Sequence, residues 1–220
     1  MSDQYLKQIR ELYGDELYLE FDLNMNDNST ISHSKINYES DLDAFNNQIN
    51  ACQKCSLGSS RKNFVFGTGD PNASLFLIGE APDEQEDLKG KPFVGSAGIL
   101  LDKILLAINR SREKDVYISN LIKCRPPKNR EPLPIEVKEC EPYLLHQINL
   151  IKPKLIVALG RVAGMTLLNV DNSLKSMRGK IHNYNGTQLI VTYHPATLLK
   201  NSNSKPEAWK DFKWIRSIID

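Results

Sequence analysis

The sequence predicts an α/β domain in which helices cover both faces of a mostly parallel sheet. Four short, almost wholly apolar runs are spread along the chain, and the segments between them place apolar residues at helical spacing. Strands buried on both faces of a parallel sheet have this continuous apolar character, and alternation of strands with helices is typical of the class. The four predicted strands are Leu75–Ile78, Val116–Ser119, Leu155–Leu159 and Leu189–Tyr193.

Helices are predicted from apolar periodicity and from proline near a first turn. Before the first strand, residues 1–20 have helical spacing, Asn24 to Ser40 form a polar linker, and Leu42–Asn50 form a short helix. The helices that alternate with the strands are predicted at Ala97–Ile108, Pro134–Leu150, Arg161–Leu168 and Pro206–Ile219.

Length and charge indicate one domain with an extension. The chain has 220 residues, of which residues 1–47 carry three basic and ten acidic side chains, a net charge of −7. The remaining residues carry 25 basic and 17 acidic side chains, a net charge of +8, which is consistent with a polyanionic partner. We expect an acidic, partly flexible extension over residues 1–45 and a folded domain over residues 46–220.

The sequence has neither an apolar run long enough for a membrane span nor a signal-peptide pattern, so we expect a cytoplasmic protein without a membrane partner. We also expect a monomer. Its four cysteines favour metal binding or catalysis over disulfides. Cys52 and Cys55 form a C-x-x-C motif, whereas fifteen residues separate Cys124 from Cys140. Zinc and a [4Fe–4S] cluster both accept four cysteines, and the widely split second pair favours the cluster.

The first predicted strand ends at Gly79 and opens into an acidic loop. Ligands of open α/β sheets bind beyond the carboxyl ends of the strands. Pro82 follows Gly79, Glu80 and Ala81 directly, and the aromatic Phe93 is held between a proline and a glycine, where a polar loop residue is expected. We therefore favour a binding site over a solvated acidic turn. The acidic residues of the loop are Glu80, Asp83, Glu84, Glu86 and Asp87.

Polar residues also follow the second predicted strand. The amide of Asn120 offers one acceptor and two donors, which suits the edge of a nucleobase, although a turn residue is the alternative. A basic cluster interrupted by prolines comes next, and we interpret it as a phosphate track. The cluster consists of Lys123, Arg125, Lys128 and Arg130.

His194 lies at the end of the fourth predicted strand, where Pro195 restricts the backbone. It is a candidate acid or electrophile, because histidine changes its charge near physiological pH. Leu198 and Leu199 follow in a short loop and are either core residues or a wedge for DNA. Lys200 is a further candidate DNA contact.

Taken in order, these segments resemble the iron–sulfur uracil-DNA glycosylases, usually called family four, from about Cys52 to Phe212. The resemblance implies a three-layer α/β/α sandwich on a four-stranded parallel sheet, with a [4Fe–4S] cluster on Cys52, Cys55, Cys124 and Cys140 that is structural or positions DNA. Residues 1–45 lie outside it. The matching motifs are CQKC, VFGTGDPNA, GEAP, QEDLKGKPFVGSAG, VYISNLIKCRPPKNREP, KPKLIVALGR, MRGK and HPATLLKN.

The resemblance also implies roles for the residues at the strand ends. Asp83 stands where the family has a glycine, which reduces backbone freedom and adds a negative charge. Glu80 is the candidate to orient the attacking water or the sugar. The resemblance further implies that Gly79, Glu80 and Ala81 surround the flipped base. It implies that Phe93 stacks on the uracil ring, that Asn120 recognises its edge and that His194 donates to uracil O2. Glu86 and Asn129 would brace the site.

We therefore expect a DNA repair glycosylase that flips uracil out of DNA and hydrolyses its N-glycosidic bond, leaving an abasic site. An asparagine amide matches uracil N3–H and O4, whereas cytosine presents the opposite pattern at both atoms. One alternative is a non-catalytic nucleic-acid-binding module with a structural four-cysteine metal site, and another is an iron–sulfur redox protein. Neither uses Phe93, Asn120 and His194 at separate strand ends.

Overall fold

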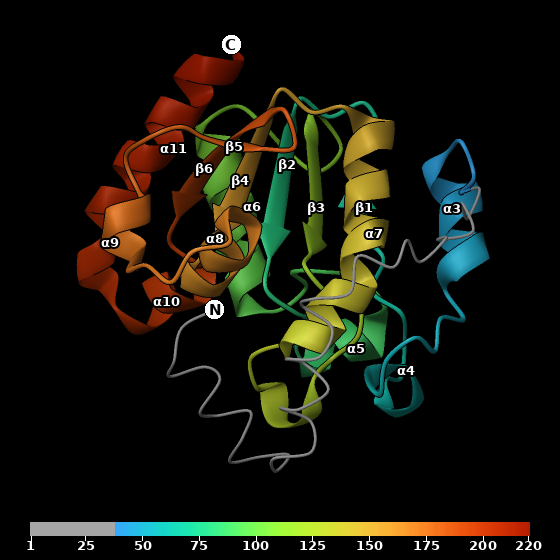
Figure 1. Cartoon of the computed structure of the whole chain (residues 1–220). Helices are drawn as coiled ribbons and strands as arrows, with labels where there is room; N and C mark the ends of the chain where they lie inside the picture. The colour runs from blue at the N-terminus through green and yellow to red at the C-terminus, as the bar shows by residue number, and fades with distance from the viewer. Residues whose placement is uncertain (1–37) are drawn as a thin grey trace, which may run out of the picture. The chain divides into compact units, whose positions relative to one another are not determined.

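A six-stranded sheet forms the centre of residues 38–220, the part of the chain that the computed structural model describes (Figure 1). Its strand order is β1-β3-β2-β4-β6-β5. The four inner strands are parallel, which confirms the predicted parallel sheet. The helix predicted over residues 1–20 and most of the predicted linker lie outside the described residues. The inner strands are β2 (Leu75–Gly79), β3 (Val116–Asn120), β4 (Leu155–Leu159) and β6 (Thr187–Thr192).

Two short edge strands correct the predicted number of strands from four to six. β1 (Thr68–Gly69) pairs antiparallel with β3, and β5 (His182–Tyr184) pairs antiparallel with β6. Segments of two and three residues are too short to show an apolar pattern. The β5–β6 hairpin nevertheless has a sequence signal, because its turn is Asn185–Gly186, and both residues have positive φ (49° and 88°).

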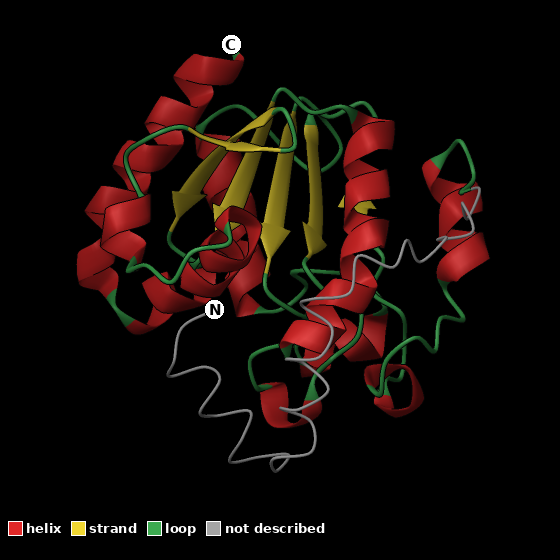
Figure 2. Ribbon diagram, viewed as in Figure 1, coloured by secondary structure: helices red, strands yellow, loops and turns green. Residues whose placement is uncertain are grey.

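Helices cover both faces of the sheet, as predicted for a three-layer sandwich (Figure 2). Alternate residues of each inner strand point to opposite faces, so Phe76 and Ile78 pack in one core and Leu75 and Leu77 in the other. One face packs against α7 (Pro134–Ile151), α8 (Arg161–Leu168) and α9 (Leu174–Met177), and the other against α6 (Ser96–Ala107) and α11 (Lys205–Ile219).

A third apolar cluster lies beside the cysteines, around α3 (Leu42–Ile49) and α4 (Leu57–Ser60). Phe45 of α3 is fully buried there, with its ring 5.6 Å from that of Phe66 and 6.1 Å from that of Tyr143. The predicted boundary between residues 45 and 46 therefore falls inside a helix that belongs to the folded unit, which spans Tyr38–Asp220.

Short helices occupy the loops at the carboxyl ends of the inner strands: α5 (Glu84–Lys89), η1 (Pro127–Asn129), α10 (Pro195–Lys200) and η2 (Ser202–Ser204). Sequence reasoning interpreted the α5 segment as an acidic loop. It is helical because Asp83 and Glu86 form a capping box, in which each side chain accepts the other's backbone N–H, at 2.9 and 3.1 Å. Within residues 38–220, no helix has the length and apolar character needed to cross a membrane.

Candidate active site and candidate metal centre

The carboxyl ends of the inner strands bring Gly79, Phe93, Asn120 and His194 together. Gly79 pairs with Asn120 across β2 and β3. A Cβ on Gly79 would lie 2.9 Å from the Phe93 ring and would also overlap Asn120 Oδ1, so only glycine leaves room for both side chains. The rings of Phe93 and His194 are 5.4 Å apart and tilted by 31°. An aromatic ring, an amide and an imidazole thus lie close together at this edge of the sheet.

Phe93 is buried and has a left-handed backbone, with φ of 54°. Such a conformation is costly for a bulky residue and requires support from its surroundings. The support comes from Glu86 Oε1, which accepts the Phe93 N–H at 2.6 Å, and from Arg112, which donates to the carbonyl oxygens of Phe93 (2.7 Å) and Pro92 (2.8 Å). Sequence reasoning missed Arg112, whose turn carries no motif.

Glu86 is the hydrogen-bonding centre of this loop. Besides the Phe93 N–H, its carboxylate accepts the Asp83 N–H at 3.1 Å and faces Asn120 Nδ2 at 3.4 Å. Burial and then the Asp83 charge raise the pKa of Glu86 to about 7, while its hydrogen-bond donors act in the opposite direction. Glu86 therefore connects the Phe93 loop to the amide of Asn120.

His194 caps α10, and this contact fixes its tautomer. Nδ1 accepts the Ala196 N–H at 3.1 Å, so the proton of a neutral ring resides on Nε2. Burial lowers the pKa of His194 to about 4, against the opposing effect of the Asp83 charge. The ring is thus neutral at pH 7 and has an Nε2–H donor. Gly160, at the end of β4, has φ of +98° and lets the backbone approach His194 Cβ closely.

A buried ion pair holds the two residues before His194. Arg178 donates to both carboxylate oxygens of Asp211, at 2.9 and 3.0 Å, and Thr192 Oγ1 donates to Asp211 at 2.5 Å. The Arg178 guanidinium also lies 4.3 Å from the centre of the Tyr193 ring. Arg178 belongs to the MRGK motif, yet sequence reasoning gave it no role, because Asp211 lies 33 residues away.

Lys123 contradicts the predicted phosphate track. Its side chain is fully buried, and Nζ donates to Ser119 Oγ at 2.6 Å and to the Asn120 carbonyl at 2.9 Å. Burial lowers its pKa to about 8, whereas the nearby Cys140 and Cys124 act to raise it. The side chain points inward because the chain remains in the core after β3, with Leu121, Ile122 and Cys124 also buried.

The other basic residues of that cluster differ in their availability. Lys128 is exposed, and Arg125 is held by Asn129 Oδ1 at 2.7 Å. Asn129 thus braces the basic loop. Arg130 is engaged by buried Glu136 through two hydrogen bonds, of 2.8 and 2.6 Å.

The remaining predicted residues also separate into buried and accessible groups. Leu198 is 1% exposed and belongs to the core, which corrects its predicted DNA contact, whereas Leu199 is 49% exposed. The two leucines point apart because α10 is helical. Lys200 is exposed. Glu80 is half-buried, and burial and then the Glu131 charge raise its pKa to about 7. Ala81 packs against the third apolar cluster, beside the cysteines.

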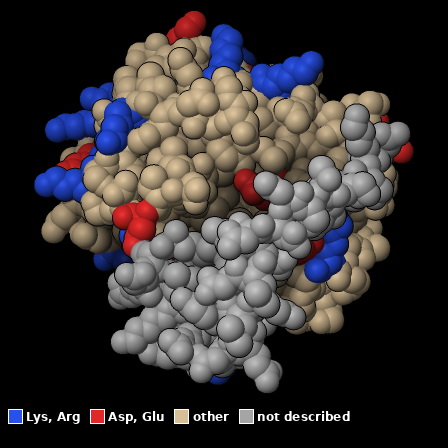
Figure 3. Space-filling model, in the orientation of Figure 1, with Lys and Arg blue, Asp and Glu red and all other residues tan. Residues whose placement is uncertain are grey.

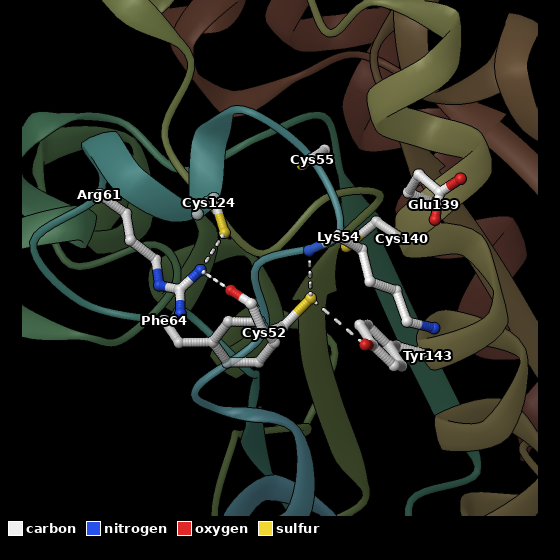
Figure 4. Close-up of a pocket in the computed structure, with 10 residues that line it drawn as sticks. Cys52, Lys54, Cys55, Arg61, Phe64, Cys124, Glu139, Cys140 and Tyr143 are labelled. Atoms are coloured by element: carbon white, nitrogen blue, oxygen red, sulfur yellow. Dashed lines mark hydrogen bonds between the residues drawn. The ribbon is translucent and has the colours of Figure 1, made fainter. Parts of the chain in front are cut away.

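The four cysteines line one pocket between α4, the loop after β3, and α7 (Figure 4). Polar hydrogens point at their sulfur atoms. Arg61 Nη1 lies 3.3 Å from Cys124 Sγ, while the Tyr143 hydroxyl and the Lys54 backbone N–H lie 3.3 and 3.5 Å from Cys52 Sγ. Donors of this kind suit sulfur atoms that carry negative charge.

Burial raises the thiol pKa of Cys124 to about 11 and that of Cys140 to about 12. Binding of a metal group to these thiols must therefore displace protons. Within residues 38–220, no group of three or more His, Cys, Asp or Glu side chains converges closely enough to hold a metal ion by itself.

Comparison with known proteins assigns the family. The model of the uracil DNA glycosylase superfamily matches residues 66–213. Proteins named Type-4 uracil-DNA glycosylase are 41% identical in Archaeoglobus fulgidus, over 80% of this chain and 92% of that protein, and 41% identical in Saccharolobus solfataricus, over 81% and 86%. The protein of that name in Thermotoga maritima is 40% identical, over 74% and 86%. The chain belongs to the uracil DNA glycosylase superfamily and, within it, to the type-4 enzymes.

Proposed function

We propose that Gly79, Phe93, Asn120 and His194 bind a uracil flipped out of DNA, and that the chain hydrolyses its N-glycosidic bond. The observation that carries this proposal is the convergence of a ring for stacking, an amide for the base edge and a neutral imidazole donor from three separate loops and strand ends on one edge of the sheet. The type-4 relatives support the same reaction.

His194 serves the step in which the bond breaks. Cleavage leaves negative charge on uracil, much of it at O2, and a preorganised donor stabilises that charge as it develops. Because Nδ1 is occupied by the Ala196 N–H, the Nε2–H is available for O2. The pKa of His194, about 4, keeps the imidazole ring neutral at pH 7. The donor is therefore an uncharged imidazole that retains its proton.

Asn120 provides the choice between uracil and cytosine. Glu86 Oε2 faces one side of the Asn120 amide group at 3.4 Å, which favours one orientation of that group. Oδ1 then accepts uracil N3–H, and Nδ2 donates to O4. Cytosine mismatches both groups, at a cost of about 1–3 kcal/mol for each unsatisfied partner.

Phe93 and Glu80 complete the pocket in this proposal. Stacking of a base on an aromatic ring contributes about 1–3 kcal/mol. The supports from Glu86 and Arg112 keep the Phe93 ring in position before DNA binds. Glu80, half-buried beside Gly79, is our candidate to orient the attacking water or the sugar.

Positive charge and one exposed leucine supply the contacts with DNA outside the pocket. Residues 38–220 carry 25 basic and 20 acidic side chains, and the Lys and Arg side chains visible in Figure 3 lie mainly along the upper and left margins of the face shown. We assign phosphate contacts to Arg125, Lys128 and Lys200, and the wedge to Leu199. Lys123 and Leu198 are excluded from this surface by their burial.

We also propose that Cys52, Cys55, Cys124 and Cys140 hold a [4Fe–4S] cluster. The support is a set of four thiols around one pocket, with N–H and O–H groups directed at sulfur. When bound, the cluster would join three segments of the chain and supply structural order rather than chemistry at the glycosidic bond. Iron and sulfide analysis of the purified protein tests this assignment, and stoichiometric zinc without iron would contradict it.

The proposed reaction is tested with oligonucleotides that contain one uracil, thymine or cytosine. We expect abasic sites, detected by alkaline strand cleavage, on the uracil strand alone. His194→Gln serves as the matched variant, because it retains a polar side chain but lacks the imidazole Nε2–H. Absence of abasic sites with iron-loaded protein would support the non-catalytic binding module instead.

A further inference from the structure

Lys123 lies between the candidate active site and the four cysteines, and solvent does not reach its side chain. On one side, its ammonium donates to the Asn120 carbonyl at 2.9 Å and to Ser119 Oγ at 2.6 Å. Ser119 in turn donates to the Phe66 carbonyl at 2.8 Å, so this end of β3 is fixed on both sides.

The other side of Lys123 reaches the four cysteines. Its main chain hydrogen-bonds the thiol of Cys140, and the next residue is Cys124. Both cysteines lie near enough for their charge to act on the ammonium. The Val65 N–H donates to the Lys123 carbonyl at 2.8 Å, which holds the backbone between the two centres.

Burial of a lysine is costly unless opposite charge and hydrogen bonds compensate for lost water. Two neutral acceptors, a hydroxyl and a carbonyl, supply the hydrogen bonds here. Cysteines that bind a metal group are thiolates, and their negative charge would then face the ammonium. The same lysine also holds the backbone of the residue assigned to the edge of uracil.

We propose that Lys123 is a positioning residue that couples the four-cysteine centre to Asn120, with its ammonium held by the negative charge of the bound group and itself holding the Asn120 backbone. The inference rests on the proposed cluster and on the proposed role of Asn120. Phe93 and His194 have separate supports in Arg112 and Asp211. Loss of the ammonium should therefore slow uracil excision through Asn120 and leave the supports of Phe93 and His194 in place.

The test is Lys123→Met in the iron-loaded protein, because methionine is similar in length and lacks both charge and donors. We expect the excision ratio, the single-turnover uracil excision rate of the variant over that of the native protein, to fall at least tenfold. In an Asn120→Ala background, Lys123→Met should change the remaining uracil rate less than twofold, since the residue through which it acts is gone. The midpoint potential of the cluster should become more negative, because a nearby positive charge is lost.

Arg110→Met is the matched control. Arg110 is also a largely buried cation, paired with Asp115 at 2.9 Å and Asp220 at 2.6 Å, but it lies at the opposite end of β3. Its replacement should lower the melting temperature and leave both the excision ratio and the potential unchanged. If Lys123→Met does not fold, Ser119→Ala keeps the charge and removes one acceptor, and the ratio should still fall about threefold.

Two results would overturn the proposal. One is an excision ratio that Lys123→Met and Ser119→Ala both leave unchanged. The other is an equal loss of rate in the Asn120 and Asn120→Ala backgrounds, which would mark Lys123 as a structural residue. Zinc in the native protein would refute the cluster alone, because the cycle with Asn120 tests the positioning role without reference to the metal.

Discussion

Replacing Asn120 by Asp would place two carboxylates against each other inside the protein. Asn120 is 1% exposed, and its Nδ2 lies 3.4 Å from Glu86 Oε2. The substitution exchanges that nitrogen for an oxygen with almost no change in shape. It should therefore lower stability through charge repulsion, and impair recognition of uracil because the amide N–H donor is lost.

The repulsion is large on the scale of protein stability. Two unit charges 3.4 Å apart repel by roughly 5 kcal/mol at an effective dielectric constant near 20. Binding of a shared proton relieves part of this, and the pKa of Glu86 is already raised to about 7 in the native protein. An acid whose pKa is raised in the folded state stabilises the fold at low pH and loses that contribution as pH rises. We expect a loss of about 2–4 kcal/mol at pH 8 and little loss at pH 5.

Thermal unfolding between pH 5 and pH 8 measures this difference. For a domain of this size, each kcal/mol corresponds to about 2–4 °C in the melting temperature. Asn120→Ala should lower the melting temperature by the same amount at both pH values. Combining Glu86→Gln with Asn120→Asp should remove the pH dependence of the loss. If Asn120→Asp lowers the melting temperature equally at pH 5 and pH 8, the two side chains do not lie close enough for their charges to interact.

The same variant tests the assignment of the uracil edge. Loss of the amide donor leaves uracil O4 unsatisfied and directs a negative oxygen at it, so single-turnover excision should fall at least a hundredfold. Binding to DNA that contains an abasic site should change little, because that DNA presents no base edge. Excision at the native rate would show that Asn120 is a turn residue.

Three further predictions follow from the surroundings of the pocket. The NMR signals of the His194 ring protons should shift with a midpoint near pH 4, and a midpoint near pH 6.5 would contradict the burial of the ring. Because its pKa is lowered in the folded state, this histidine destabilises the fold as pH falls from about 6.5 to 4. Asp211→Asn removes the buried partner of Arg178, which keeps its ion pair with Glu207, and should cost about 1.5–3 kcal/mol in urea unfolding. Arg161→Gln, at an exposed pair, should cost at most about 1 kcal/mol. Asp83→Gly should cost only a few tenths of a kcal/mol, because glycine is tolerated at an N-cap, and should tighten DNA binding at low salt; a tenfold loss of excision rate would assign Asp83 a catalytic role.

Strands and strand ends were predictable because their signals are local. An apolar run identifies a buried parallel strand, and the carboxyl ends of parallel strands meet at one edge of the sheet. Gly79 and Asn120 each follow such a run, so their proximity follows from the topology. Phe93 was found through its unusual neighbours, although the left-handed backbone that places its ring is visible only in the structure.

Side-chain direction in irregular segments was not predictable. Lys123 and Arg125 are two residues apart after the same strand, yet one is fully buried and the other is partly exposed. No periodicity applies to the turn between them. The partnership of Arg178 with Asp211 was hidden for a different reason, since it depends on how α11 packs beside β6 rather than on any neighbour in the sequence.

Asp83 shows how an aspartate is accommodated at the start of α5. Its φ of −87° lies outside the region that favours glycine, so aspartate adds no backbone strain and gains the capping bond to Glu86. Its charge acts on two neighbours, raising the pKa of Glu86 and opposing the fall in the pKa of His194. Burial outweighs that charge at His194, whose pKa still lies near 4, so the imidazole stays neutral. Replacement of Asp83 by glycine should therefore lower both pKa values while leaving the Nε2–H donor of His194 in place.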